Sequence, residues 1–374
     1  SAMIYLNGEF MPIELARVPV LDRGFIFGDG VYEVIPVYSR HPFRLAEHLR
    51  RLQASLDGIR LANPHDDVEW TRLVRRLIEL NEPEDQSLYL HVTRGVAKRD
   101  HAFPSGVAPT VFMMSNALST PPPEQVEKGV GAITAADNRW LRCDIKAIAL
   151  LPNVLLRQLA VDASCVEAVL LRDGIMTEGA ASNIFVVKDG ILLAPPKNNL
   201  MLPGITYDVV LELAQADGIK HEVRPVWESE LRGADEAWLT SSTKEVLAIV
   251  RLDGKAVGGG VPGALFRRMY TLYQEYKERV MRAPGGMMEG ESLIEYPTDF
   301  PIKVMGRREP RLVQTIVEIV RRHAPDFDPA TVELRTSRKN RYLSVTCTVR
   351  ATSREQLDAL YRELCDHPSV VMVL

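Results

Sequence analysis

The order of the elements expected in the C-terminal part of the sequence is the feature that most restricts the fold. Apolar periodicity there predicts a strand, a helix, two strands, a helix and a last strand. This βαββαβ order is that of the ferredoxin-like split βαβ unit. We therefore expect residues 292–374 to form a separate domain with its own small core. The elements are expected at residues 302–305, 311–323, 332–336, 343–350, 354–366 and 370–374.

A change in composition separates this unit from the rest of the chain. Residues 284–291 are rich in glycine and have no apolar periodicity, which is typical of a flexible linker. A proline-rich connector at residues 119–123 divides the preceding part once more. The 374 residues are thus expected to form a small N-terminal α/β domain at 3–120, a large domain at 124–283 and, after the linker, the C-terminal domain.

Both N-terminal domains are expected to mix strands and helices, so the fold class is α+β or mixed. Asn7-Gly8 between alternating residues predicts a hairpin at the start of the chain. Thr206 is expected to cap the helix that begins at Tyr207. Further strands are expected at residues 31–38, 88–93, 111–115, 131–135, 168–172, 183–187, 191–194 and 237–239, and helices at 44–57, 67–80, 150–163, 207–216 and 263–282.

Charge and composition exclude several classes of function. The net charge is −4, so no basic field exists to attract nucleic acid or an anionic membrane. No apolar stretch approaches the roughly 20 residues that span a bilayer, and no signal peptide is recognised at the start. The four cysteines lack the spacing of a zinc site or a disulfide framework, and Cys143 is expected to fill apolar space. We expect a cytoplasmic protein without a metal site.

Two charged residues in the large domain fit the needs of pyridoxal-phosphate chemistry. Such an enzyme requires a lysine that forms a Schiff base with the cofactor and a carboxylate that keeps the pyridine nitrogen protonated. Lys146 is the candidate lysine, fixed by its place just before the helix expected at 150–163. Glu178, near the start of the strand expected at 183–187, is the candidate carboxylate. Neither residue is informative alone, because most lysines are solvated surface charges.

A phosphate group needs backbone N–H groups, hydroxyls and a guanidinium. The segment from Pro203 to Thr206, with Gly204 and Ile205, opens a helix and offers the first of these. Ser241 and Ser242 follow an expected strand and offer hydroxyls, and Arg51 offers the guanidinium. Taken singly, these signals are weak, because such features are most often an ordinary helix start, a loop and a surface charge.

A substrate carboxylate needs fixed cationic donors. Arg99 and His101 lie two positions apart in a basic loop after an expected strand. In an extended loop their side chains point the same way, which suits a shared carboxylate. The alternative interpretation of these residues is a charged loop that is simply exposed to solvent.

Taken together, these motifs resemble the fold-type IV pyridoxal-phosphate enzymes over about residues 3–281. That group contains D-amino-acid aminotransferases, branched-chain aminotransferases and aminodeoxychorismate lyases. Five motifs carry the resemblance, namely FGDGVYE at 27–33, HLRRL at 48–52, CDIK at 143–146, EG with SNIF at 178–185, and LPGIT at 202–206. The loop with Arg99 and His101 is most similar to the carboxylate-binding loop of the D-amino-acid enzymes.

The resemblance implies a fold-type IV architecture, pyridoxal 5′-phosphate as cofactor and a homodimer with the active site at its interface. It implies that Arg99 and His101 come across that interface and that Tyr32 completes the carboxylate site. Leu202 is implied behind the cofactor ring. Phosphate contacts are implied from Arg51, Ile205, Thr206, Ser241 and Ser242. Ala180 and Ala181 depart from the pattern, because several relatives have serines there.

The C-terminal domain resembles small YbeD-type, ACT-like proteins and contains no catalytic constellation. Two roles are possible for this domain: it binds a small effector at the turn 306–310, or it has a structural or oligomerisation role.

Three functions are compared. The first is transamination of D-amino acids, D-alanine and 2-oxoglutarate giving pyruvate and D-glutamate. The second is another enzyme of the group, a branched-chain L-amino-acid aminotransferase or an aminodeoxychorismate lyase. The third is a scaffold whose C-terminal domain senses an amino acid. Lys146 and Glu178 favour an enzyme, and the loop with Arg99 and His101 favours D-amino acids.

Overall fold

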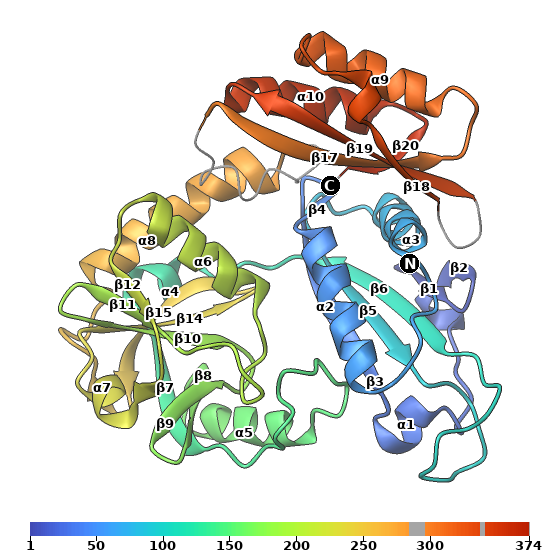
Figure 1. Cartoon of the computed structure of the whole chain (residues 1–374). Helices are drawn as coiled ribbons and strands as arrows, with labels where there is room; N and C mark the ends of the chain where they lie inside the picture. Colours follow the sequence, from blue (N-terminus) through green and yellow to red (C-terminus); the bar gives the residue numbers. More distant parts are fainter. Residues whose placement is uncertain (284–295, 337–340, 374) are drawn as a thin grey trace.

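The computed structural model describes residues 1–283, 296–336 and 341–373. The linker expected at residues 284–291 lies outside this range. Three β-sheets organise the described chain, each with helices packed on it (Figure 1). The mixture of strands and helices is the one expected from the sequence.

The first sheet belongs to the N-terminal part and has six strands in the order β2-β1-β6-β5-β3-β4. Two amphipathic helices, α2 (Leu45–Gly58) and α3 (Asp67–Leu80), bury their apolar stripes against this sheet. The hairpin at Asn7-Gly8 is confirmed. The other elements are β1 (Met3–Leu6), β2 (Glu9–Pro12), η1 (Ile13–Leu15), α1 (Arg23–Phe27), β3 (Gly30–Tyr38), β4 (His41–Pro42), β5 (Gln86–Thr93) and β6 (Thr110–Ala117).

The second sheet has ten strands in the order β12-β11-β10-β14-β15-β7-β8-β9-β13, with β16 paired to β15. Helices α6 (Ile205–Ala216) and α8 (Ala264–Tyr276) share one buried core with its strands, and α5 (Leu151–Asp162) shares another. The strands are β7 (Val130–Ala136), β8 (Glu167–Arg172), β9 (Ile175–Gly179), β10 (Asn183–Lys188), β11 (Ile191–Ala194), β12 (His221–Val223), β13 (Val226–Trp227), β14 (Glu236–Ser241), β15 (Glu245–Leu252) and β16 (Lys255–Ala256). The shorter helices are α4 (Pro123–Lys128), α7 (Glu228–Arg232) and the π-helical turn η2 (Lys277–Met281).

The third sheet confirms the βαββαβ order of the C-terminal part. Its four strands run in the order β18-β19-β17-β20, and α9 and α10 share a buried core with one face of it. The opposite face is turned toward α3 of the N-terminal part (Figure 1). The elements are β17 (Thr298–Arg307), α9 (Leu312–His323), η4 (Pro329–Thr331), β18 (Glu333–Thr336), β19 (Tyr342–Ala351), α10 (Arg354–Asp366) and β20 (Val370–Val373).

Two local expectations are wrong. Thr206 does not cap α6, because that helix begins one residue earlier, at Ile205, with Gly204 at the cap position. The last helix of the large domain is not one regular α-helix over 263–282, since it changes to π-helical geometry after Tyr276. Strand β9, which carries Glu178, was not expected. Within the described residues, each helix falls short of the length and apolar character that crossing a bilayer demands.

Candidate active site

A cleft of about 690 Å³ has walls from both N-terminal domains. It brings together nearly all of the residues that the sequence singled out. Strand β3 contributes Tyr32 and helix α2 contributes Arg51, and the remaining residues come from the large domain. The predicted residues that line the cleft are Tyr32, Arg51, Lys146, Glu178, Leu202, Gly204, Ile205, Thr206, Ser241 and Ser242.

Lys146 is held by the small domain rather than by the helix that follows it. Helix α5 begins only at Leu151, five positions on. The backbone N–H of Lys146 instead donates to the hydroxyl of Ser55 on α2 (3.1 Å), and its carbonyl accepts from the N–H of Tyr32 on β3 (3.0 Å). The lysine Nζ lies 4.3 Å from the centre of the Tyr32 ring. The backbone of Lys146 is therefore fixed as expected, but by contacts with α2 and β3 rather than by helix α5.

The environment of Lys146 favours a partly neutral amine. Burial, together with repulsion from the Arg51 guanidinium, lowers the pKa of Lys146 from 10.5 to about 8. A lysine with this pKa is neutral in about a tenth of molecules at pH 7, whereas an ordinary lysine is neutral in fewer than about one in a thousand. Only the neutral amine attacks a carbonyl, so the site prepares Lys146 as a nucleophile.

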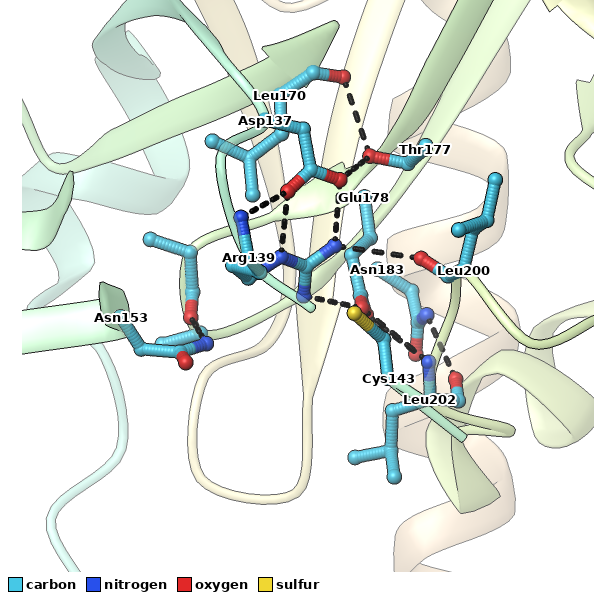
Figure 2. Close-up of polar contacts among 12 residues, drawn as sticks. Asp137, Arg139, Cys143, Asn153, Leu170, Thr177, Glu178, Asn183, Leu200 and Leu202 are labelled. Carbon is cyan, nitrogen blue, oxygen red and sulfur yellow. Dashed lines mark hydrogen bonds and ion pairs between the residues drawn. The ribbon is translucent and has the colours of Figure 1, made fainter. Parts of the chain in front are cut away.

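Glu178 lies on β9 with only 5% of its surface exposed. One carboxylate oxygen accepts from Arg139 Nη1 at 2.7 Å, and the backbone N–H of Leu202 donates to both oxygens at 3.2 and 3.3 Å (Figure 2). Burial raises the pKa of Glu178 to about 7, and the Arg139 guanidinium opposes that rise. A cation against this carboxylate would stabilise its charged form.

Arg139 belongs to a chain of charges that the sequence analysis missed. Its Nε and Nη2 donate to the two oxygens of Asp137, each at 2.9 Å. Asp137 also accepts from Thr177 at 2.9 Å, so it orients the Arg139 guanidinium toward Glu178 (Figure 2). Arg172 pairs with the same carboxylate at 3.0 Å. Arg139 and Thr177 hold the pKa of Asp137 below its usual range despite burial. An Asp-x-Arg motif directly after strand β7 was the available signal.

Arg51 is likewise oriented by a partner that the sequence analysis missed. Glu33 on β3 is fully buried and accepts from Arg51 Nε (2.9 Å) and Nη2 (2.8 Å). His48 Nδ1 lies 2.7 Å from the same carboxylate. Arg51 Nη1 donates to the carbonyl of Pro203 (3.1 Å), which leads directly into α6. The guanidinium is therefore fixed at the edge of the cleft beside the start of that helix.

The N-terminus of α6 faces the cleft beside the hydroxyls of the Thr240–Ser242 segment. A side chain at Gly204 would place its Cβ only 2.0 Å from Asn183 Oδ1, so the close approach of these two segments requires glycine there. Free N–H groups at a helix start, hydroxyls and a fixed arginine together suit a phosphate. Thr240 Oγ1 is buried and, among the described residues, has no hydrogen-bond partner.

Arg99 and His101 are not part of this cleft in a single chain. Both are exposed, in the loop after β5. Their side chains pack on the ring of Phe27, with Arg99 Cζ and the His101 ring centre each 5.3 Å from its centre. The expectation that the two side chains share one direction agrees with this contact. Their role toward a substrate remains a prediction.

The alanines that replace expected serines lie beside another buried carboxylate. Glu167 accepts from the backbone N–H groups of Ala180 (3.0 Å) and Ala181 (3.2 Å) and from the Ser182 hydroxyl (2.6 Å). The turn is thus held by two main-chain donors and one hydroxyl, and the two alanine side chains take no part. Cys143 is buried, and it also lines the cleft.

Residues 30–252 match the family model described as amino-transferase class IV. The chain belongs to this family. Residues 291–374 of this class IV aminotransferase match a second model, described as a protein of unknown function, DUF493. The aminotransferase part thus precedes a separate C-terminal domain whose family has no assigned role.

Similar proteins of this class include two D-alanine aminotransferases. That of Bacillus licheniformis is 41% identical over 72% of this chain and 95% of its own length. That of Staphylococcus epidermidis is 38% identical over 73% of this chain and 97% of its own.

Solved structures confirm the expected fold class. A branched-chain amino acid aminotransferase of Escherichia coli superposes with a TM-score of 0.66 and 27% identity, covering 72% of this chain and 93% of the other. A second branched-chain amino acid aminotransferase, from T.th. and solved with pyridoxamine 5′-phosphate, gives a TM-score of 0.70 and 26% identity, covering 79% and 98%.

Proposed function

We propose that this aminotransferase transfers the amino group of D-amino acids, with D-alanine and 2-oxoglutarate as the preferred pair, and that it uses pyridoxal 5′-phosphate. The observation that carries the proposal is the meeting of Lys146, Glu178 and the α6 N-terminus in one cleft. The higher identity to D-alanine aminotransferases than to the branched-chain enzymes supports the choice of substrate.

The residues of the cleft match the parts of the cofactor. Bound pyridoxal 5′-phosphate supplies an aldehyde for an amine and a ring that accepts electrons from the substrate Cα. Lys146 attaches that aldehyde, and Glu178 stabilises a proton on the ring nitrogen. Leu202, which lines the cleft, would lie against the ring. The phosphate contacts are assigned to Arg51, Gly204, Ile205, Thr206, Ser241 and Ser242.

Lys146 also moves the proton of the reaction. With pyridoxal 5′-phosphate bound, the Lys146 amine would be the base that takes the proton from the substrate Cα and the acid that returns it to the cofactor. The lowered pKa of Lys146 suits both directions of that transfer. The contact with the Tyr32 ring at 4.3 Å restricts where the amine can move.

The substrate carboxylate is assigned to Tyr32 together with Arg99 and His101 of a second subunit. Arg99 and His101 are exposed and outside their own chain's cleft, so a homodimer is needed to bring them to a cleft. Large apolar side chains near this loop and along α5 are also exposed, which suits a protein interface. They include Val20, Phe25, Leu151, Val154 and Leu155.

An assay with a panel of D- and L-amino acids and 2-oxoglutarate tests the proposal. We expect turnover of D-alanine and production of D-glutamate. Turnover confined to L-leucine, L-isoleucine or L-valine would reject it in favour of the specificity named for the solved relatives. Release of pyruvate from aminodeoxychorismate without 2-oxoglutarate would instead identify a lyase.

A further inference from the structure

A second cleft, of about 650 Å³, lies between the N-terminal domain and the C-terminal domain. One wall is the segment that leads into α3, and the other is the open face of the C-terminal sheet. Its size falls in the range of clefts that hold small organic ligands, roughly 300–1,000 Å³. The active site does not use this cleft, since their linings have no residue in common.

The two walls carry opposite charges. Asp66, Asp67 and Glu69 at the start of α3 make one wall acidic, and Lys303, Arg335 and Arg341 make the other basic. Glu69 is paired with Arg72 of its own helix at 2.6 Å. For the part of the chain that the structure describes, the other five charged side chains form no ion pair with any side chain, across the cleft or elsewhere.

The acidic wall gathers two exposed carboxylates at the start of α3, where Asp66 also accepts from the backbone N–H of Glu69 at 2.8 Å. Partial desolvation and repulsion from Asp66 raise the pKa of Asp67, and attraction from Lys303 and Arg50 only partly offsets this. A cationic group between the two aspartates would relieve that repulsion, and an anionic group would do the same for the basic wall. Met305 on β17 and Tyr342 on β19 line the sheet wall of the cleft and offer apolar contact to a ligand that joins the two charges.

We propose that this interdomain cleft binds a small zwitterion with a free ammonium and a free carboxylate, an amino acid or short peptide. The ammonium faces Asp66 and Asp67, and the carboxylate faces Lys303 and Arg341. The α2 helix connects this cleft with the active site. Gln53 lines the interdomain cleft, whereas Arg51 lines the catalytic one and Ser55 holds the backbone of Lys146.

Isothermal titration of the full-length, cofactor-loaded protein with glycine and with glycylglycine tests the proposal. We expect saturable binding of at least one probe. N-acetylglycylglycine and glycylglycine amide each lack one charge and are expected to bind at least tenfold more weakly. Asp67→Asn and Lys303→Met should each weaken binding at least tenfold, while Glu318→Gln, on the exposed face of α9, should not.

The same variants separate this cleft from the active site and from simple domain docking. Asp67→Asn and Lys303→Met should keep the transamination rate of the unchanged protein. Binding that is equal in both variants would belong to the catalytic cleft and overturn the proposal, as would no binding at millimolar probe. It would also be overturned if the single variants lowered the melting temperature without probe and Asp67→Lys with Lys303→Asp restored it, because the charges would then fasten the domains.

Discussion

Arg139 donates a hydrogen bond of 2.7 Å to Glu178, and both side chains are more than nine-tenths buried. The pair joins the segment after β7 to β9 in the wall of the cleft. It sets the charge of the carboxylate that we assign to the cofactor nitrogen.

Replacing Arg139 with methionine should raise the pKa of Glu178 further, because the cation that opposes burial is lost. The acid limb of the pH profile of kcat/KM should then move upward, by about one unit or more. Arg139→Lys should restore part of the shift. Arg142→Met, which removes an exposed arginine nearby, is the matched control. An unchanged acid limb in Arg139→Met would show that Arg139 does not control Glu178.

Glu178→Ala should leave the cofactor bound and reduce turnover severely, about a hundredfold or more, through loss of charge stabilisation at the ring. Lys146 and the phosphate contacts are unaffected by the change, which is why binding should persist. The visible absorption of the bound cofactor and kcat with D-alanine are measured on the same preparation. Normal turnover in Glu178→Ala would contradict the assignment.

Glu33 makes the stability of the protein depend on pH. Arg51 and His48 lower the pKa of Glu33 from 4.5 to about 2 despite complete burial. Because the folded-state pKa is depressed, the stabilisation is present above pH 4.5 and is lost as the pH falls toward 2. Arg51→Met leaves this carboxylate buried without its partner and should lower the free energy of unfolding at pH 7 by about 3 kcal/mol. Urea unfolding measures this, and an unchanged midpoint in Arg51→Met would contradict it.

Mixing two inactive variants tests whether subunits share active sites. Lys146→Ala lacks the amine, and Arg99→Met lacks the cation assigned to the neighbouring subunit. A heterodimer of the two contains one site with both residues intact, so random mixing should restore about a quarter of the wild-type sites. The D-alanine rate is compared before and after co-refolding. If Arg99 acted within its own chain, the rate would stay at that of the separate variants.

Much of the fold followed from local pattern. The βαββαβ order, the Asn7-Gly8 hairpin and helices α2 and α3 depend on apolar periodicity and turn chemistry within short segments, which a sequence displays directly. The residue at the cap of a helix was harder to predict from the sequence. Gly204 rather than Thr206 caps α6, because the contact with Asn183 from a distant strand leaves room only for glycine.

The candidate site, too, could be predicted only in part. The motifs identified side chains that face the cleft, but not the partners that orient them. Arg139 and Glu33 act through pairs 39 and 18 positions apart, Arg139 with Glu178 and Glu33 with Arg51. Such pairs arise from the way strands and helices are placed next to one another. Periodicity carries no information about that placement.

Reduction of the cofactor-loaded protein with borohydride, followed by proteolysis and mass spectrometry, tests the central claim most directly. The reduction makes a cofactor–lysine link permanent. We predict that the pyridoxyl group is found on the peptide containing Lys146, that Lys188→Ala, which changes an exposed lysine, leaves it there, and that Lys146→Ala abolishes it. A label on any other lysine, or no label on protein incubated with pyridoxal 5′-phosphate, would contradict the account.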